Sequence, residues 1–178
     1  MPNDKMLKTL YAATLILSGS DRQAEVHIKE AQKLKEEYLI SENSLTDDLL
    51  HKRVDKEGLR AFFLYVDETR ESVMKKKEAL ENAIKRCPNF RSGLFQLAIC
   101  WLQLQRPQEA IKVLEELSLQ DPNDITCAYY LAELYYQRYN MPSAWKAYNK
   151  AEKLARAKGK IPQALVNLKT IFSIRDPS

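Results

Sequence analysis

Apolar and polar positions in residues 91–104 follow the period of an α-helix and form two separate stripes. The first stripe consists of Leu94, Leu97, Ala98, Trp101 and Leu104. The second lies roughly a quarter-turn away and consists of Phe95, Ile99 and Leu102, with Gln103 at its border. One stripe is enough to bury an amphipathic helix in a core, so the second predicts a further contact.

The same pattern returns at a fixed distance along the chain. Pro88-Asn89 recurs 34 residues later as Pro122-Asn123, and Ala110 recurs at the same distance as Ala144. Small and large residues recur in matching places, with Ala98 and Ala132, Leu97 and Leu131, Trp101 and Tyr135, and Leu114 and Tyr148. This period predicts an array of helix-turn-helix repeats with frames at residues 91–124 and 125–158.

These paired positions resemble the tetratricopeptide repeat (TPR) family. The resemblance implies an all-α fold, a right-handed solenoid of helical hairpins with a capping helix at its C-terminal end. It also implies a scaffold that binds another protein. TPR domains that hold acidic chaperone tails carry Lys, Asn and Arg in their groove. Here Phe95, Ile99, Tyr129 and Glu133 stand there, so the resemblance does not extend to that clamp.

The rest of the chain is divided less sharply, although we expect residues 1–178 to form a single TPR-like domain. The expected segments are a degenerate helix pair at 5–38, an insertion at 39–56, a divergent helix or helix pair at 57–90, and a capping helix at 161–173. Residues 46–86 leave two interpretations open because Gly58 is their only helix breaker. They form either one long bent helix or two helices broken near residues 67–72.

Composition narrows the class of protein. The chain has 178 residues, of which 45% are hydrophobic and 29% charged, and this is typical of a globular domain. A net charge of +4 permits acidic partners. The basic stretch from Lys146 to Lys160 has no interleaved stacking aromatics, which argues against nucleic-acid binding. Its cations are explained by the dipole of the helix that carries them.

The N-terminal apolar run and the cysteines bear on the compartment. Residues 10–17 are too few to cross a membrane and follow no basic leader, so we expect no membrane association. Cys87, Cys100 and Cys127 show no paired spacing, and reduced thiols are the simplest interpretation. The sequence therefore predicts a cytoplasmic protein.

The second stripe is the candidate binding surface, because the corresponding positions of stacked first helices line the concave face of such an array. The predicted partner-binding residues are Phe95, Ile99, Leu102, Gln103, Tyr129, Tyr130, Glu133 and Tyr136. They predict an apolar and aromatic groove for a peptide segment or helix of another protein. Alternatively, the insertion or the C-terminal helix of the chain itself fills this space. If Tyr136 is a groove anchor, its removal weakens binding and leaves stability nearly unchanged.

Catalytic motifs are lacking in the sequence. His27 and His51 lie among Lys and Glu without metal-ligand spacing, and there is no glycine-rich phosphate loop or nucleophile elbow. We therefore expect a non-catalytic adaptor with no catalytic residue, metal, cofactor or small-molecule substrate. The alternative function is a small TPR chaperone of a secretion-system client, similar to the translocator chaperones of type III secretion. A self-associating subunit is a third possibility, and the oligomeric state stays open.

Overall fold

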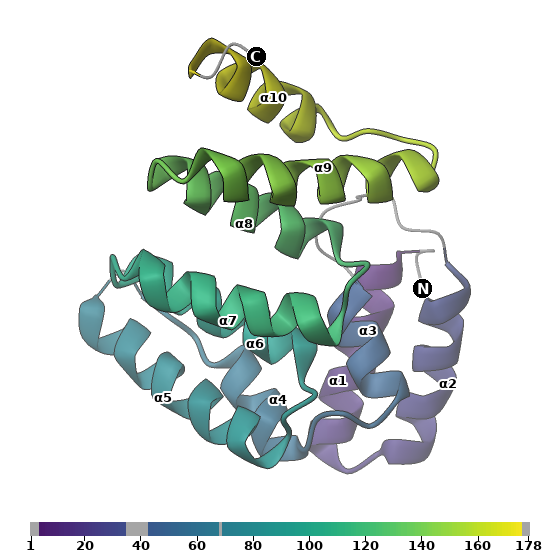
Figure 1. Ribbon diagram of the computed structural model, residues 1–178. Coiled ribbons are helices and arrows are strands. Elements are labelled where there is room, and N and C mark those ends of the chain that lie inside the picture. The colour runs from purple at the N-terminus through teal and green to yellow at the C-terminus, as the bar shows by residue number, and fades with distance from the viewer. Residues whose placement is uncertain (1–3, 35–42, 68, 176–178) are drawn as a thin grey trace. The chain divides into compact units, whose positions relative to one another are not determined.

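The computed structural model describes residues 4–34, 43–67 and 69–175. All regular secondary structure in these residues is α-helical (Figure 1). The all-α fold predicted from the hydrophobic period is therefore confirmed.

The chain divides into two compact units, residues 1–106 and 107–178. The boundary falls inside the predicted repeat 91–124, between its first and second helices. Each unit has its own buried side chains. The single domain over residues 1–178 stays a prediction.

The first unit contains six helices among its described residues. They are α1 (Lys5–Ser18), α2 (Asp21–Lys33), α3 (Asn43–Leu50), α4 (Lys56–Phe63), α5 (Arg70–Arg86) and α6 (Arg91–Gln103). α1 pairs with α2, and α5 lies against both α4 and α6. The short helix α3 packs on α2 and α6, so it joins the two helix pairs of this unit.

Side-chain caps explain where several of these helices begin. The Asp4, Asp55 and Thr69 side chains accept hydrogen bonds from the backbone N–H of Leu7, Gly58 and Ser72, which start α1, α4 and α5. Each such bond satisfies a donor that a helix N-terminus otherwise leaves unpaired. α1 ends at Gly19, whose φ of 87° lies in the left-handed region that glycine adopts readily.

Residues 43–86 differ from both interpretations of the sequence, because they form three helices. The break between the end of α4 at Phe63 and the start of α5 at Arg70 overlaps the expected one, whereas the break between α3 and α4 was not predicted. Lys52 ends α3 with a positive φ of 53°, and Asp55 then caps α4. The sequence signal for the break between α3 and α4 is Asp55, a favoured N-cap residue, together with the acidic Glu57 in the first turn of α4. This signal was missed.

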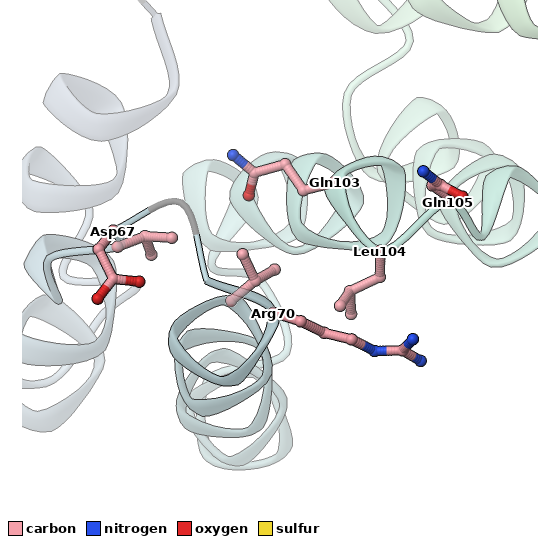
Figure 2. Close-up of a pocket in the computed structure, with 7 residues that line it drawn as sticks. Asp67, Arg70, Gln103, Leu104 and Gln105 are labelled. Atoms are coloured by element: carbon pink, nitrogen blue, oxygen red, sulfur yellow. The ribbon is translucent and has the colours of Figure 1, made fainter.

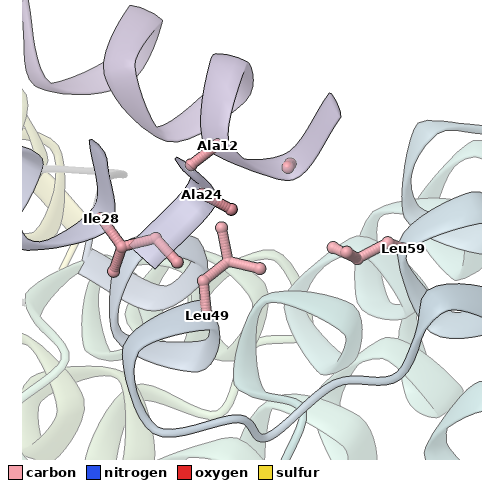
Figure 3. Close-up of a cluster of buried hydrophobic side chains, with 6 residues drawn as sticks. Ala12, Ala24, Ile28, Leu49 and Leu59 are labelled. Carbon is pink, nitrogen blue, oxygen red and sulfur yellow. The ribbon is translucent and has the colours of Figure 1, made fainter. Parts of the chain in front are cut away.

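Small side chains allow α1 and α2 to approach closely. Ala12, Ala13 and Ala24 are buried where the helices meet. Ile28, Leu49 and Leu59 complete this cluster from α2, α3 and α4 (Figure 3). The predicted insertion therefore contributes core residues through Leu49. Residues 39–42 of that insertion and 35–38 of the predicted helix pair lie outside the described residues.

A buried carboxylate ties α3 to the beginning of α6. Asp48 has a fully buried side chain, and its Oδ2 accepts hydrogen bonds from the Ser92 N–H and the Ser92 hydroxyl, each at 2.8 Å. Arg53 Nη1 lies 3.6 Å from Oδ1. Because α6 has no side-chain cap of its own at Phe90, Asp48 supplies the acceptor from another helix. A second polar contact joins the Thr9 and Thr46 hydroxyls at 2.7 Å.

Gly93 is placed where α6 has no room for a side chain. A Cβ atom added there would lie 2.3 Å from the nearest ring carbon of Phe90. Phe90 is itself fully buried, so its ring has little freedom to move aside. The absence of a side chain at position 93 therefore lets the Phe90 ring lie directly against α6.

The second unit contains four helices among its described residues. They are α7 (Pro107–Gln120), α8 (Ile125–Gln137), α9 (Met141–Ala157) and α10 (Gln163–Arg175). α8 and α9 lie side by side, α7 contacts α8, and α10 contacts both α8 and α9 (Figure 1). Asp124 caps α8 and Asn140 caps α9, where Pro142 occupies the first turn. α10 begins and ends two residues later than the predicted range 161–173.

The recurring small and large residues of the predicted repeats are mostly buried. Ala110, Ala132 and Ala144 are fully buried, as is Ala98 in the first unit. Leu114 and Tyr148, which recur at the same repeat position, are nearly inaccessible. Trp101 and Tyr135 differ because both are only partly buried. Lys77 Nζ lies 4.6 Å from the Trp101 ring centroid, and the Tyr135 hydroxyl donates to Glu115.

Candidate functional site

The predicted binding residues of α6 lie on its less buried side. Phe95, Ile99 and Leu102 are half-buried, whereas Leu94, Leu97 and Ala98 of the first stripe are buried. Gln103 is exposed at the C-terminal end of the helix. The division of α6 into a core stripe and a more accessible stripe therefore follows the sequence pattern, apart from the partial exposure of Trp101 and Leu104.

The predicted binding residues of α8 are all half-buried. Tyr129 and Tyr130 lie edge to face, with ring centroids 5.7 Å apart and planes at 88°. Burial raises the pKa of Tyr129, and the charge of Glu133 adds to this because it disfavours a phenolate. Tyr129 therefore presents a neutral hydroxyl, which can donate or accept a hydrogen bond beside an apolar ring.

Tyr136 is engaged by the chain's own C-terminal helix. Its ring stacks on Phe172 of α10 with centroids 4.9 Å apart and planes at 16°. The Arg175 guanidinium lies 5.0 Å from the Tyr136 centroid and 4.2 Å from that of Tyr139. At this position the structure therefore matches the alternative in which the C-terminal helix occupies the predicted surface. Tyr136 also contributes to the packing of α10, which the sequence pattern did not indicate.

The predicted site is divided between the two units. Phe95, Ile99, Leu102 and Gln103 belong to the first unit, and the three tyrosines and Glu133 belong to the second. The structure thus presents one candidate surface on α6 and another on α8. Their combination into a single groove stays a prediction.

A pocket that the sequence did not predict lies in the first unit, between the start of α5 and the end of α6. Its volume is about 510 Å³, within the range of ligand-sized pockets. It is lined by Val66, Asp67, Arg70, Val73, Gln103, Leu104 and Gln105. Figure 2 shows Leu104 extending from α6 toward α5, with the Arg70 side chain beside it. Of the predicted residues, only Gln103 lines this pocket.

The charged groups at the pocket rim differ in their local partners. Asp67 accepts hydrogen bonds from the Thr69 N–H and hydroxyl, and these bonds hold the pKa of Asp67 below its usual value. Arg70 is exposed, and none of the described hydrogen bonds or ion pairs involves its guanidinium. The carboxylate is therefore engaged next to the start of α5, whereas the exposed guanidinium makes no ion pair with the described residues.

The two histidines and the buried cysteines are not among the predicted binding residues or the residues that line the pocket. Burial raises the pKa of the Cys100 and Cys127 thiols, and Cys127 Sγ donates to the Leu114 carbonyl at 3.0 Å. His27 lies edge-on to Tyr11, and His51 Nδ1 is 2.9 Å from the Asp47 carbonyl. Within residues 4–34, 43–67 and 69–175, no three metal-binding side chains gather into a site.

Comparison with known families identifies the repeats. Residues 77–134, from within α5 into α8, match a family model described as tetratricopeptide repeat. This matched segment carries the tetratricopeptide repeat pattern. The TPR resemblance drawn from the 34-residue period is thereby confirmed. No curated protein matches the chain.

The TPR match includes all the candidate residues of α6 and most of those of α8. Tyr129, Tyr130 and Glu133 lie inside it, whereas Tyr136 lies two residues beyond its end. TPR arrays generally mediate contacts between proteins. No helix in the described part of the chain combines the length and apolarity needed to cross a membrane.

Proposed function

We propose that the chain is a non-catalytic adaptor that binds a segment of another protein through the accessible faces of α6 and α8. The observation that carries the proposal is the half-buried pair Tyr129 and Tyr130 within the TPR match. Tyrosine at an interface supplies a large apolar contact and a hydrogen-bonding hydroxyl at little cost in conformational entropy. Phe95 and Ile99 supply further apolar area on α6.

Glu133 gives the α8 surface a polar element. It lies one helical turn from Tyr129, so both side chains are on the same face of α8. A carboxylate beside a neutral tyrosine hydroxyl can accept hydrogen bonds from the backbone or side chains of a bound segment. With Tyr136 packed against α10, we assign partner contact chiefly to Tyr129, Tyr130 and Glu133 in the second unit.

The test is a selection of peptides displayed on phage against the full chain, followed by calorimetric titration of the selected peptides. Tyr129→Ala should weaken their binding by about 1–3 kcal/mol, as expected for an aromatic anchor. Tyr65→Ala is the matched control because Tyr65 is 81% exposed and lies outside both candidate surfaces. Equal affinity of the wild type and Tyr129→Ala for every selected peptide would contradict the proposal.

A further inference from the structure

The floor of the pocket beside α5 and α6 is aliphatic. Val73 is buried, and Val66 and Leu104 are half-buried. Three aliphatic side chains around a volume of about 510 Å³ favour an apolar side chain as occupant, since its burial removes apolar surface from water.

The rim of the pocket favours a ligand that carries a negative charge. Asp67 is already engaged by Thr69, and the Asp67 N–H is 3.1 Å from the Ser72 hydroxyl oxygen that accepts its hydrogen bond. Arg70 contributes a guanidinium that is not used by the described residues. An acidic group bound there gains a charged hydrogen-bonding partner without displacing any ion pair of the described residues.

The side of the rim formed by α6 carries carboxamides. Gln103 and Gln105 are exposed, and Gln105 has a positive φ of 57° where the chain leaves the helix. A carboxamide can both donate to and accept from a peptide backbone. The pocket thus combines an aliphatic floor, a cation from α5 and two amide side chains from the α6 end (Figure 2).

We propose that this pocket binds an extended partner segment in which an acidic side chain stands next to an aliphatic one. The aliphatic side chain enters between Val66, Val73 and Leu104, and the carboxylate pairs with Arg70. This inference rests on the proposed function, because it assigns the pocket to recognition of a partner protein. It concerns the first unit alone and does not require Tyr129 or the surface of α8.

The probe is the acetylated and amidated hexapeptide Gly-Ser-Asp-Leu-Ser-Gly, titrated into the isotopically labelled full chain and followed by NMR. We expect amide shifts at Arg70, Val73 and Leu104. Arg70→Gln should weaken binding about fivefold, in the upper range for an accessible ion pair. Replacing the peptide's Leu with Ala should weaken it about tenfold through lost apolar burial.

A thermodynamic cycle isolates the ion pair. The peptide with Asn in place of Asp should bind the wild type about fivefold more weakly, and Arg70→Gln should then cause no further loss. Arg22→Gln is the matched control, because Arg22 is also an exposed arginine in the first turn of a helix. Binding to Arg22→Gln should equal that of the wild type.

The result that overturns the inference is equal binding of the Asp and Asn peptides, or shifts confined to residues outside the pocket. Tyr129→Ala separates this from failure of the proposed function. The hexapeptide should bind Tyr129→Ala and the wild type equally. If the phage-selected peptides lose affinity on Tyr129→Ala while the hexapeptide produces no shift at the pocket, the adaptor function stands and the pocket assignment falls.

Discussion

The Tyr136 ring stacks on the Phe172 ring with their planes only 16° apart, so a residue predicted to contact a partner contacts the chain's own last helix. Phe172 is fully buried and also meets the Trp145 and Tyr148 rings edge to face. This aromatic cluster fixes α10 on α8 and α9. The Tyr136 ring thus packs against the chain's own helix, so we expect its removal to lower stability, unlike the small effect expected of a groove anchor.

The first prediction concerns the coupling of these two rings. Phe172→Ala should lower the free energy of unfolding by about 3–5 kcal/mol, because it empties a buried aromatic site. Tyr136→Ala should lower it less, since Tyr136 is half-buried. A double-mutant cycle by chemical denaturation should give a coupling energy of about 0.5–1.5 kcal/mol. Strict additivity of the two losses would show that the stacked pair has no energetic role.

The second prediction concerns Gly93. Gly93→Ala should lower the free energy of unfolding by about 1–3 kcal/mol through overlap with the Phe90 ring, although alanine favours a helix by about 1 kcal/mol. Thermal and denaturant unfolding measure the change. Gly58→Ala is the matched control in α4, where the nearest atom is Cγ2 of the half-buried Val54 at 2.7 Å. A rotation of that side chain relieves the contact, so Gly58→Ala should be the milder change.

The third prediction concerns the acceptor that Asp48 offers to α6. Asp48→Ala leaves the Ser92 N–H and hydroxyl without their partner and should destabilise the protein by about 1–3 kcal/mol. Hydrogen exchange should show the loss as faster exchange in the first turn of α6. Asp47→Ala on the same helix is the control, because the Asp47 side chain is only half-buried. If Asp47→Ala and Asp48→Ala destabilised the protein equally, Asp48 would not act as a cap for α6.

The fourth prediction follows from the pKa of the same carboxyl group. Burial raises the pKa of Asp48 above its usual 3.8, although the Ser92 hydrogen bonds and Arg53 oppose the shift. Protonated Asp48 is therefore more favourable in the folded protein than ionised Asp48. This stabilisation is fully present below pH 3.8 and is lost as the pH rises through the folded-state pKa of Asp48. Asp48→Asn stays neutral, so its unfolding free energy relative to the wild type should improve over that rise. A pH-independent difference between the two proteins would contradict the assignment.

The fifth prediction concerns the thiols. Only the thiolate attacks a disulfide reagent, and burial raises the pKa of Cys100 and Cys127. In the native protein, Ellman's reagent should react with Cys87, which is half-buried, well before the other two. All three should react at similar rates in denaturant. Rapid reaction of Cys127 in the native protein would mean that α7 and α8 open readily around it.

Much of the fold could be predicted from the sequence because a 34-residue period constrains many positions at once. Ala98, Ala132 and Ala144 recur where helices touch, and a helix contact tolerates only small side chains there. A C-terminal helix was also expected at residues 161–173, and α10 occupies Gln163–Arg175. These features are visible in the sequence because they recur at a fixed period or have local signals.

Apart from the Asp55 cap, the features that were missed depend on residues far apart in the chain. The hydrogen bonds from Ser92 to Asp48 cross 44 residues, and no local pattern links them. Tyr136 occupies an accessible position on its own helix, and only the position of Phe172 shows that it is covered. The pocket combines the start of α5 with the end of α6, so it could not be found from the pattern of either helix alone.

The Asp48 contact also limits how the protein can be shortened. A fragment trimmed to the family match at residues 77–134 would retain Ser92 but discard its acceptor. The N–H groups at the amino end of α6 would then have to be satisfied by water, and the first turn of α6 would fray. Domain boundaries chosen for expression or grafting should therefore include α3, even though this helix lies outside the repeat period.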